Sequence, residues 1–273
     1  MNSITAHGMI MPKLGLGTWR LAGEACTTAV LGALERGYRH IDTAQMYGNE
    51  DAVGVALAAT PVKRGDIHLT TKVWVEDLAP AAMQRAMENS LKQLQVSYVD
   101  LYLIHWPAPG MDLAASLGQL VKFKEQGLAR HIGVSNFPIA LLKRAIEEIQ
   151  APIVCNQFEY HVLLDQSKLA AYARGKGLAV TAYCPLAQGR LADHPSLDAI
   201  ADKHGCTPAQ VALAWLLAQD GVAAIPKAGR AESQLANLAA FKVTLDDADR
   251  GLIAALPKGQ RFVSPGFAPA WDS

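Results

Sequence analysis

The sequence predicts an α/β protein folded as a (β/α)8 TIM barrel that forms one domain over residues 1–273. The first observation is an alternation of short β-prone runs with amphipathic stretches, each long enough to return the chain to the start of a parallel sheet. The second is that eight such units fill a chain of ordinary barrel length, which favours a barrel over a doubly wound sheet. The expected strands cover 14–17, 38–41, 68–73, 99–105, 131–135, 154–157, 179–183 and 223–226.

Helices are expected between these strands. Residues 80–95 place apolar side chains three and four positions apart, which predicts an amphipathic helix, and residues 165–176 give a second example. Gly37, Gly127 and Gly177 stand where helices should end, because glycine readily adopts the left-handed conformation that follows a last helical turn.

Three segments lie outside the minimal barrel. Ile4 and Ile10 flank Ala-His-Gly, a pattern that predicts an N-terminal hairpin closing the bottom of the barrel. Residues 197–219 and 246–256 are helical in pattern but surplus to eight units, so we expect them as extra peripheral helices.

The chain is electrically neutral and rich in apolar residues. It has 25 Lys and Arg against 25 Asp and Glu, and no basic cluster of the length that binds nucleic acid or a membrane surface. Apolar residues make up 51% of the chain, but no apolar run approaches the ~20 residues of a membrane span. The start of the sequence shows no leader pattern. We expect a cytoplasmic monomer with no nucleic-acid or membrane partner.

Four cysteines are scattered along the chain without a C-x-x-C pair. This spacing predicts reduced thiols and argues against both a disulfide framework and a metal site. They are Cys26, Cys155, Cys184 and Cys206.

Four residues suited to proton-coupled carbonyl chemistry follow predicted strands: Asp42, Tyr47, Lys72 and His105. The C-terminal ends of barrel strands form the rim where catalytic groups gather. The Lys72 ammonium would lower the pKa of Tyr47, while Asp42 would hold the ammonium in place. Tyr47 would then exchange a proton with a carbonyl oxygen that His105 orients. Each residue alone has an ordinary structural explanation, but their shared place at one rim favours catalysis.

Reduction of a carbonyl group also needs a hydride source, normally a nicotinamide. The Rossmann fingerprint is absent, because Arg20 stands where its third glycine belongs. Phosphate-binding loops of barrels follow strands seven and eight, here at 183–189 and 225–230. Lys227 and Arg230 are the candidate anion ligands, next to a helix N-terminus that favours an anion.

Amides and tryptophans complete the expected pocket. Ser135, Asn136 and Gln157 have the donors and acceptors to hold a carboxamide, although strand-end hydrogen bonding would also explain them. Three tryptophans lie near strand ends and could wall a cavity for small carbonyl compounds, as an alternative to capping the core. They are Trp19, Trp74 and Trp106.

Nearly the whole chain resembles the aldo-keto reductase family. The resemblance rests on Gly-Tyr-Arg-His-Ile-Asp-Thr-Ala-Gln-Met-Tyr-Gly-Asn-Glu at 37–50, Leu-Ile-His-Trp-Pro at 103–107, Ile-Gly-Val-Ser-Asn-Phe at 132–137 and Ile-Pro-Lys at 225–227. It implies a (β/α)8 barrel that reduces aldehydes and ketones with NADPH. The short tail at 261–272 resembles the bacterial branch of 2,5-diketo-D-gluconate and methylglyoxal reductases.

The resemblance assigns the same roles to the four rim residues. It also implies that Tyr183 stacks on the nicotinamide ring, and that residues 186–189 line the pyrophosphate. The family often has Ser and Arg where this chain has Ala228 and Ser233, so Arg230 would have to favour NADPH over NADH. The expected cofactor contacts are Gly17, Thr18, Trp19, Asp42, Ser135, Asn136, Gln157, Tyr183, Pro185, Leu186, Gln188, Gly189, Ile225, Lys227, Ala228, Gly229, Arg230, Gln234 and Asn237. The expected substrate pocket is Trp19, Tyr47, Trp74, His105, Trp106 and Trp271.

Two other functions use the same residues. A Schiff-base aldolase would need a neutral Lys72, which Asp42 disfavours by stabilising the charge. A non-catalytic nicotinamide-binding or structural member of the same fold is the alternative that stays open.

Overall fold

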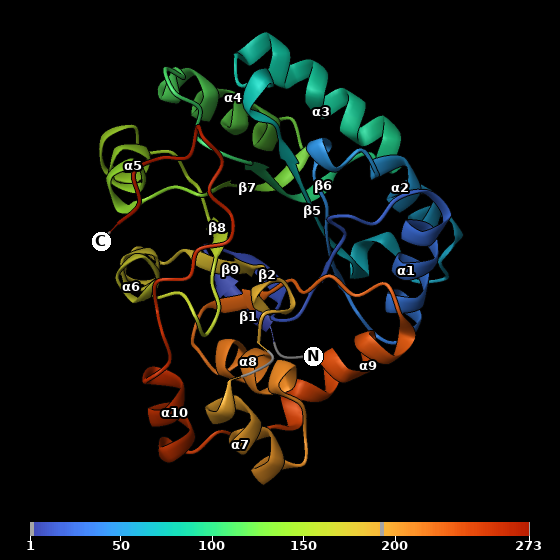
Figure 1. Cartoon of the computed structure of the whole chain (residues 1–273). Coiled ribbons are helices and arrows are strands. Elements are labelled where there is room, and N and C mark those ends of the chain that lie inside the picture. The colour runs from blue at the N-terminus through green and yellow to red at the C-terminus, as the bar shows by residue number, and fades with distance from the viewer. Residues whose placement is uncertain (1–2, 192–193, 273) are drawn as a thin grey trace.

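Eight parallel strands form the centre of the computed structural model, which describes residues 3–191 and 194–272 (Figure 1). Each strand pairs with the next along the chain, and parallel bridges from Leu14 to Ala224 and from Gly17 to Lys227 join the last strand to the first. The sheet is therefore closed, and the predicted (β/α)8 barrel is confirmed, with every expected strand overlapping an observed one. The strands are β3 (Leu16–Gly17), β4 (His40–Asp42), β5 (His68–Val73), β6 (Val99–Ile104), β7 (Ala129–Ser135), β8 (Cys155–Glu159), β9 (Ala179–Tyr183) and β10 (Val222–Ala224).

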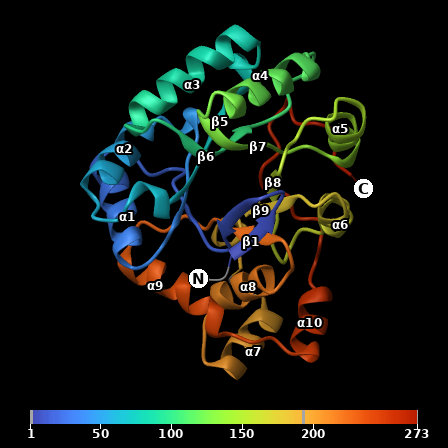
Figure 2. The same cartoon turned by 180° about the vertical axis from the view of Figure 1, so that it is seen from behind.

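Helices surround the barrel on the outside, as the front and back views show (Figures 1 and 2). The expected helices at 80–95 and 165–176 correspond to α3 and α6. The three glycines expected at helix ends follow α1, α4 and α6 with φ of 99°, 73° and 74°, in the left-handed region. The helices are α1 (Gly23–Glu35), α2 (Glu50–Ala59), α3 (Pro80–Leu94), α4 (Leu113–Glu125), α5 (Ile139–Lys143), α6 (Ser167–Gly175), α7 (Pro195–His204), α8 (Pro208–Leu217), α9 (Ala231–Ala239) and α10 (Asp247–Ala254). No helix of the described residues is long and apolar enough to cross a membrane.

The N-terminal hairpin is present and lies at the bottom of the barrel (Figure 2). Strands β1 (Ser3–Ala6) and β2 (Met9–Pro12) pair antiparallel around a turn in which His7 and Gly8 have positive φ. Met9 and Met11 are fully buried and pack in one cluster with interior residues of the barrel strands. The hairpin thus closes the end of the barrel opposite the rim.

The extra helical stretch expected at 197–219 is wrong as a single peripheral unit. Gly205, with a φ of 60°, ends α7, and Thr207 starts α8 with a capping box to Gln210. Leu213 and Leu216 of α8 belong to the main core around the barrel, so α8 is an ordinary barrel helix. Helices α7 and α10 pack together in a separate apolar cluster outside it, as expected for the peripheral helices.

Two buried histidines make the stability of this fold depend on pH. The rings of His40 and His68 lie edge to face at 4.9 Å, and burial lowers the pKa of both. The unfolded chain therefore binds more protons than the folded one as the pH falls through the ordinary histidine range near 6.5. Stability from these groups is present above that range and is lost progressively below it.

We expect His68→Gln to flatten this dependence, because each histidine that protonates only on unfolding contributes up to ~1.4 kcal/mol per pH unit. Urea titrations at pH 7.5 and 5.5 would measure the change in the free energy of unfolding. His7→Gln is the matched control, since that ring is exposed and bonds the Lys176 carbonyl at the surface. Equal slopes for the parent and His68→Gln would contradict the prediction.

Candidate active site

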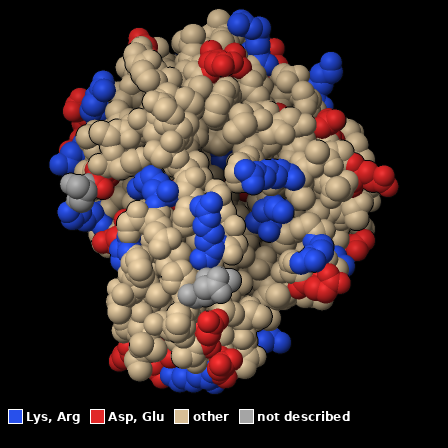
Figure 3. Space-filling model, viewed as in Figure 1, with Lys and Arg blue, Asp and Glu red and all other residues tan. Residues whose placement is uncertain are grey.

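A cavity of about 490 Å³ opens at the C-terminal ends of the strands. Figure 3 looks onto this end of the barrel and shows the hollow at its centre. Gln157 of β8 and the ends and following segments of β3, β4, β6, β7, β9 and β10 line it, together with Val263 near the C-terminus. The four residues that the sequence proposed for catalysis lie here. Asp42, Tyr47 and His105 line the cavity, and Lys72 forms an ion pair with Asp42.

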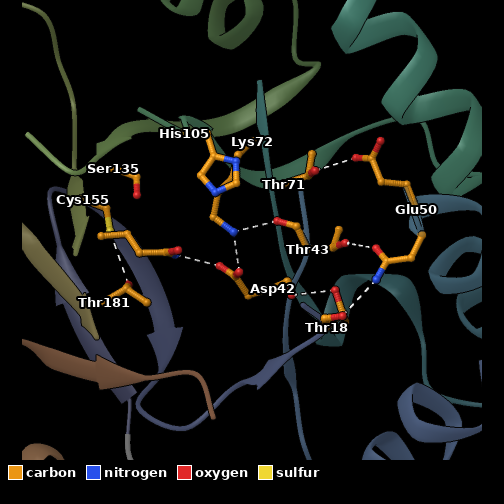
Figure 4. A network of polar contacts seen from close by, with 12 residues as sticks. Thr18, Asp42, Thr43, Glu50, Thr71, Lys72, His105, Ser135, Cys155 and Thr181 are labelled. Carbon is orange, nitrogen blue, oxygen red and sulfur yellow. Dashed lines mark hydrogen bonds and ion pairs between the residues drawn. The ribbon is translucent and has the colours of Figure 1, made fainter. Parts of the chain in front are cut away.

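Lys72 and Asp42 form this ion pair across β5 and β4 (Figure 4). The Lys72 Nζ donates to Asp42 Oδ1 at 2.5 Å and to the Thr43 carbonyl at 2.8 Å. Gln157 on β8 donates its Nε2 to the second carboxylate oxygen at 2.8 Å. Both charged groups are buried. Hydrogen bonds among the side chains of β4, β5 and β8 and the Thr43 carbonyl hold them in position.

Tyr47 and His105 line the cavity beside this pair. Tyr47 ends a short 3-10 turn (Gln45–Tyr47), and its ring meets the His105 ring edge to face at 5.6 Å. The Lys72 Nζ lies 5.1 Å from the centroid of the Tyr47 ring. The structure thus brings together all four residues that the sequence proposed for catalysis.

Two neighbours of Tyr47 that sequence reasoning did not select hold its loop in place. Asn49 accepts from the Thr43 hydroxyl at 2.8 Å and donates to the Thr18 carbonyl at 2.9 Å. Glu50 is buried and accepts from Thr71 and from Ser90 at 3.0 Å. Their signal was in the Gly-Asn-Glu that follows Tyr47 in the segment at 37–50.

The protonation states differ in one respect from the expectation. Burial raises the pKa of Tyr47 well above its usual value, and the negative charge of Asp42 adds to this effect. The expected lowering by Lys72 is therefore corrected: the phenol stays protonated at neutral pH. Burial also lowers the pKa of Lys72, which Asp42 opposes, and burial together with the Lys72 charge lowers the pKa of His105 well below its usual value. His105 is thus neutral.

Most of the expected cofactor contacts line the same cavity. Gly17 has a specific reason to be glycine, because a Cβ there would lie 2.6 Å from the Ile225 carbonyl oxygen. The lining residues among the expected contacts are Gly17, Thr18, Trp19, Asp42, Asn136, Gln157, Tyr183, Pro185, Leu186, Gln188, Gly189, Ile225 and Lys227.

Six expected contacts lie outside the lining. Ser135 is buried and accepts from the Asn136 side chain, and Ala228, Gly229 and Arg230 continue the loop after β10, with Arg230 exposed before α9. Gln234 is buried and donates its Nε2 to the Ala29 and Ala228 carbonyls at 2.9 and 3.0 Å. Its amide therefore fastens α9 to the neighbouring helix and loop. Asn237 is also buried.

The carboxamide candidates are not equivalent in the structure. Asn136 donates to the His105 carbonyl and to Ser135 Oγ, both at 3.0 Å, and accepts from the Tyr183 hydroxyl at 2.7 Å. Its side-chain amide is engaged within the protein. Among the described residues, Gln157 uses only its Nε2, on Asp42, which leaves its Oε1 as an acceptor at the cavity.

The loop after β9 has an unusual backbone. Cys184, Ala187 and Gln188 have φ of 48°, 49° and 54°, a left-handed conformation that strains residues with a Cβ. Such strain concentrates at functional sites, where the surrounding structure holds it in place. The observation agrees with the sequence assignment of this loop to ligand binding.

Aromatic side chains wall the outer cavity, and some of them come from the C-terminal tail (residues 257–272). Trp19 and Trp106 line the cavity, and Trp74 packs on His105 at 5.2 Å. Phe267, which the sequence analysis did not select, meets Trp74 and Trp106 at 5.9 Å each. Trp271 packs on Trp106 at 5.9 Å, so the tail carries two rings to the pocket.

Glu159 at the end of β8 anchors this tail. Its buried carboxylate accepts from the backbone N–H groups of Phe262 at 2.8 Å and Val263 at 2.9 Å. His161 donates its Nε2 to the same group at 3.0 Å, since its Nδ1 accepts from the Leu163 N–H. No sequence signal identified this anchor.

The described residues contain no group of three or more His, Cys, Asp or Glu side chains that could hold a metal ion. The four cysteines are free thiols. The phenol of Tyr47 lies beside an imidazole and a buried ion pair, groups that suit proton transfer and hydrogen bonding to an oxygen.

Comparison with known proteins assigns the chain to a family. The profile of the Aldo/keto reductase family matches residues 13–257. The chain belongs to the aldo/keto reductase family. It is 43% identical to the methylglyoxal reductase DkgB of Salmonella typhi over 268 residues, which cover 97% of this chain and 100% of that protein. It is 39% identical to the methylglyoxal reductase DkgA of Escherichia coli (strain K12) over 258 residues, 93% of each chain.

Solved structures agree with this assignment. A protein designated 2,5-diketo-D-gluconic acid reductase B matches with a TM-score of 0.96 at 38% identity, covering 100% of this chain and 98% of that chain. An aldo/keto reductase from Brucella melitensis matches with a TM-score of 0.89 at 40% identity, over 93% and 97% of the two chains. This aldo/keto reductase is therefore an oxidoreductase, and the family resemblance seen in the sequence is confirmed.

Proposed function

We propose that this aldo/keto reductase reduces small aldehydes and ketones, of the methylglyoxal or 2,5-diketo-D-gluconate type, to alcohols with NADPH. Tyr47 is the proton donor in this proposal. The observation that carries it is the placement of the Tyr47 phenol and the His105 imidazole on one cavity wall, beside the buried Lys72–Asp42 pair. The names of the relatives support the choice of substrates.

The cavity residues fit a nicotinamide dinucleotide. Gln157 offers a free Oε1 to a carboxamide N–H, and Tyr183 presents a ring at the lining. Arg20 and Lys227 line the cavity and bring positive charge to it in a protein of zero net charge. When bound, a reduced nicotinamide supplies the hydride.

Tyr47 gives its proton to the carbonyl oxygen as that oxygen becomes basic. Its raised pKa keeps the phenol protonated until then. The Lys72 ammonium then stabilises the phenolate, and Asp42 keeps the ammonium in position. The neutral imidazole of His105 is at the lining to hydrogen-bond the same oxygen and hold it toward Tyr47.

The test follows the absorbance of NADPH and of NADH with methylglyoxal, 2,5-diketo-D-gluconate and an aromatic aldehyde. We expect oxidation of NADPH with at least one carbonyl compound, and a slower reaction with NADH. Binding of NADPH without turnover of any of the three would favour the non-catalytic alternative and refute the proposal.

Arg230→Ala should weaken NADPH binding about tenfold to a hundredfold and leave NADH binding unchanged. Arg230 is exposed in the loop before α9, and its planar fork can bond a 2′-phosphate in two places, a charge-assisted contact of ~1.5 to 3 kcal/mol. Fluorescence titration at fixed salt would give both dissociation constants. Arg85→Ala, an exposed arginine on α3, is the matched control. Equal weakening of both cofactors, or of neither, would contradict the assignment.

The monomeric state, the cytoplasmic location and the single-domain organisation remain predictions from the sequence.

A further inference from the structure

We propose that Arg261 binds the carboxylate of a carbonyl substrate, and so makes this reductase select keto or aldehyde acids over neutral carbonyl compounds. The inference rests on the proposed function, because it concerns the second end of the substrate whose carbonyl group faces Tyr47. It separates the two kinds of compound named for the relatives, since methylglyoxal is neutral and 2,5-diketo-D-gluconic acid ionises.

One nitrogen of the half-buried Arg261 guanidinium lacks the partner that its burial requires. Its Nη1 is buried without a hydrogen-bond partner in the part of the chain that the structure describes. The guanidinium stacks on the ring of Trp271, with Cζ 3.8 Å from the ring centroid. Leaving a charged donor unpaired and shielded from water costs free energy, so the site is incomplete without an acceptor.

The carboxylates near Arg261 are already occupied. Glu159 accepts from two tail amides at 2.8 and 2.9 Å and from His161 at 3.0 Å. Asp272 uses both oxygens to accept from the Ile139 N–H at 3.2 and 3.0 Å. Neither forms an ion pair with Arg261 among residues 3–191 and 194–272. They fix the tail on both sides of the guanidinium, and its Nη1 stays without a partner among the described residues.

Arg261 lies beside the cavity. Val263, two residues along the tail, and Tyr183, whose hydroxyl feels the Arg261 charge, both line the cavity. On the other side, Trp271 joins Arg261 to Trp106 of the lining. A substrate held between these aromatic walls thus has the catalytic phenol at one end and a guanidinium near the other.

The charge distribution around the mouth supports an anionic substrate. Lys and Arg side chains gather around the central hollow, while most Asp and Glu side chains lie toward the edge of this face (Figure 3). Such a field raises the local concentration of anions. Arginine adds geometry, because its planar fork matches a carboxylate in a bidentate pair.

The test uses 4-carboxybenzaldehyde and its methyl ester, which present the same aldehyde with and without a negative charge. The parent protein should show the higher kcat/KM for the acid. Arg261→Gln, which keeps a planar amide but no charge, should lower kcat/KM for the acid about tenfold to a hundredfold, the range of a charge-assisted hydrogen bond. The ester should stay within twofold. Arg261→Lys should recover part of the loss, since it keeps the charge without the fork.

Arg190→Gln is the control for a general field effect. Arg190 directly follows Gly189 of the cavity lining and stacks on an aromatic tail residue, Phe262, at 4.5 Å. We expect a change of less than threefold for both substrates. Equal losses on acid and ester in Arg261→Gln would show that Arg261 only packs on Trp271, and a parent without preference for the acid would also overturn the inference.

A binding measurement separates this inference from the proposed function. Calorimetric titration with 4-(hydroxymethyl)benzoate, the product of reducing the acid, needs no turnover. Weaker binding to Arg261→Gln than to the parent would support the carboxylate site even if no carbonyl compound were reduced. Unchanged binding would refute the site while leaving reduction of neutral carbonyl compounds intact.

Discussion

Replacing Tyr47 by Phe should lower the turnover number for aldehyde reduction by at least ~100-fold, within the range that general acid catalysis supplies. The substitution removes one oxygen and keeps the ring that meets His105 at 5.6 Å, so the cavity wall is preserved. The dissociation constant of NADPH should therefore stay near the parent value. Steady-state kinetics and a fluorescence titration on the same preparation would measure both quantities.

Tyr102→Phe is the control for removing a buried phenol oxygen. Tyr102 lies in β6 within the core, and its hydroxyl has no partner among the described residues. We expect no loss of turnover and no loss of stability in this variant, because no hydrogen bond is removed. Turnover of Tyr47→Phe within threefold of the parent would show that another group supplies the proton.

Replacing Lys72 by Met should cost both stability and turnover. The buried Asp42 carboxylate would lose its cation and keep only the Gln157 amide on one oxygen. Removing one partner of a buried ion pair typically destabilises a protein by about 3–5 kcal/mol. Turnover should fall as well, because no ammonium would remain to stabilise the Tyr47 phenolate. Urea unfolding and steady-state kinetics would follow the two losses.

The double variant Lys72→Met with Asp42→Leu separates the loss of stability from the loss of turnover. It removes both buried charges, so most of the stability should return, while turnover should remain low. A single Lys72→Met variant that loses less than about 1 kcal/mol would mean that Asp42 is not left as an uncompensated buried charge.

The sequence was a good guide to the catalytic rim because barrel strands place their C-terminal ends together. Asp42 ends β4, Lys72 is the last residue but one of β5, and His105 directly follows β6, so counting strands was enough to bring them to one edge. The pKa of Tyr47 could not be predicted in the same way. The pKa is raised by burial and by the charge of Asp42, and the extent of burial depends on packing that the sequence does not show.

The sequence contains a local signal that divides the helical stretch at 197–219 into two helices, but the apolar periodicity continues across it. Gly205 and the Thr207-Pro-Ala-Gln210 capping box break the pattern, while apolar residues continue on both sides. Only packing showed that α8 covers β10 and that α7 lies outside with α10.

The sequence by itself determined the barrel and the strand ends, because these follow from local periodicity. It also showed directly which residue types stand at those ends for proton transfer. The tertiary structure decided what lies opposite the catalytic wall. Glu159 holds tail amides more than a hundred positions away, at sequence separations of 103 and 104, and thereby sets Arg261 and Trp271 beside the cavity. Local sequence carries no trace of such a contact, since the hydrogen bonds exist only after the barrel has brought the end of β8 and the tail together.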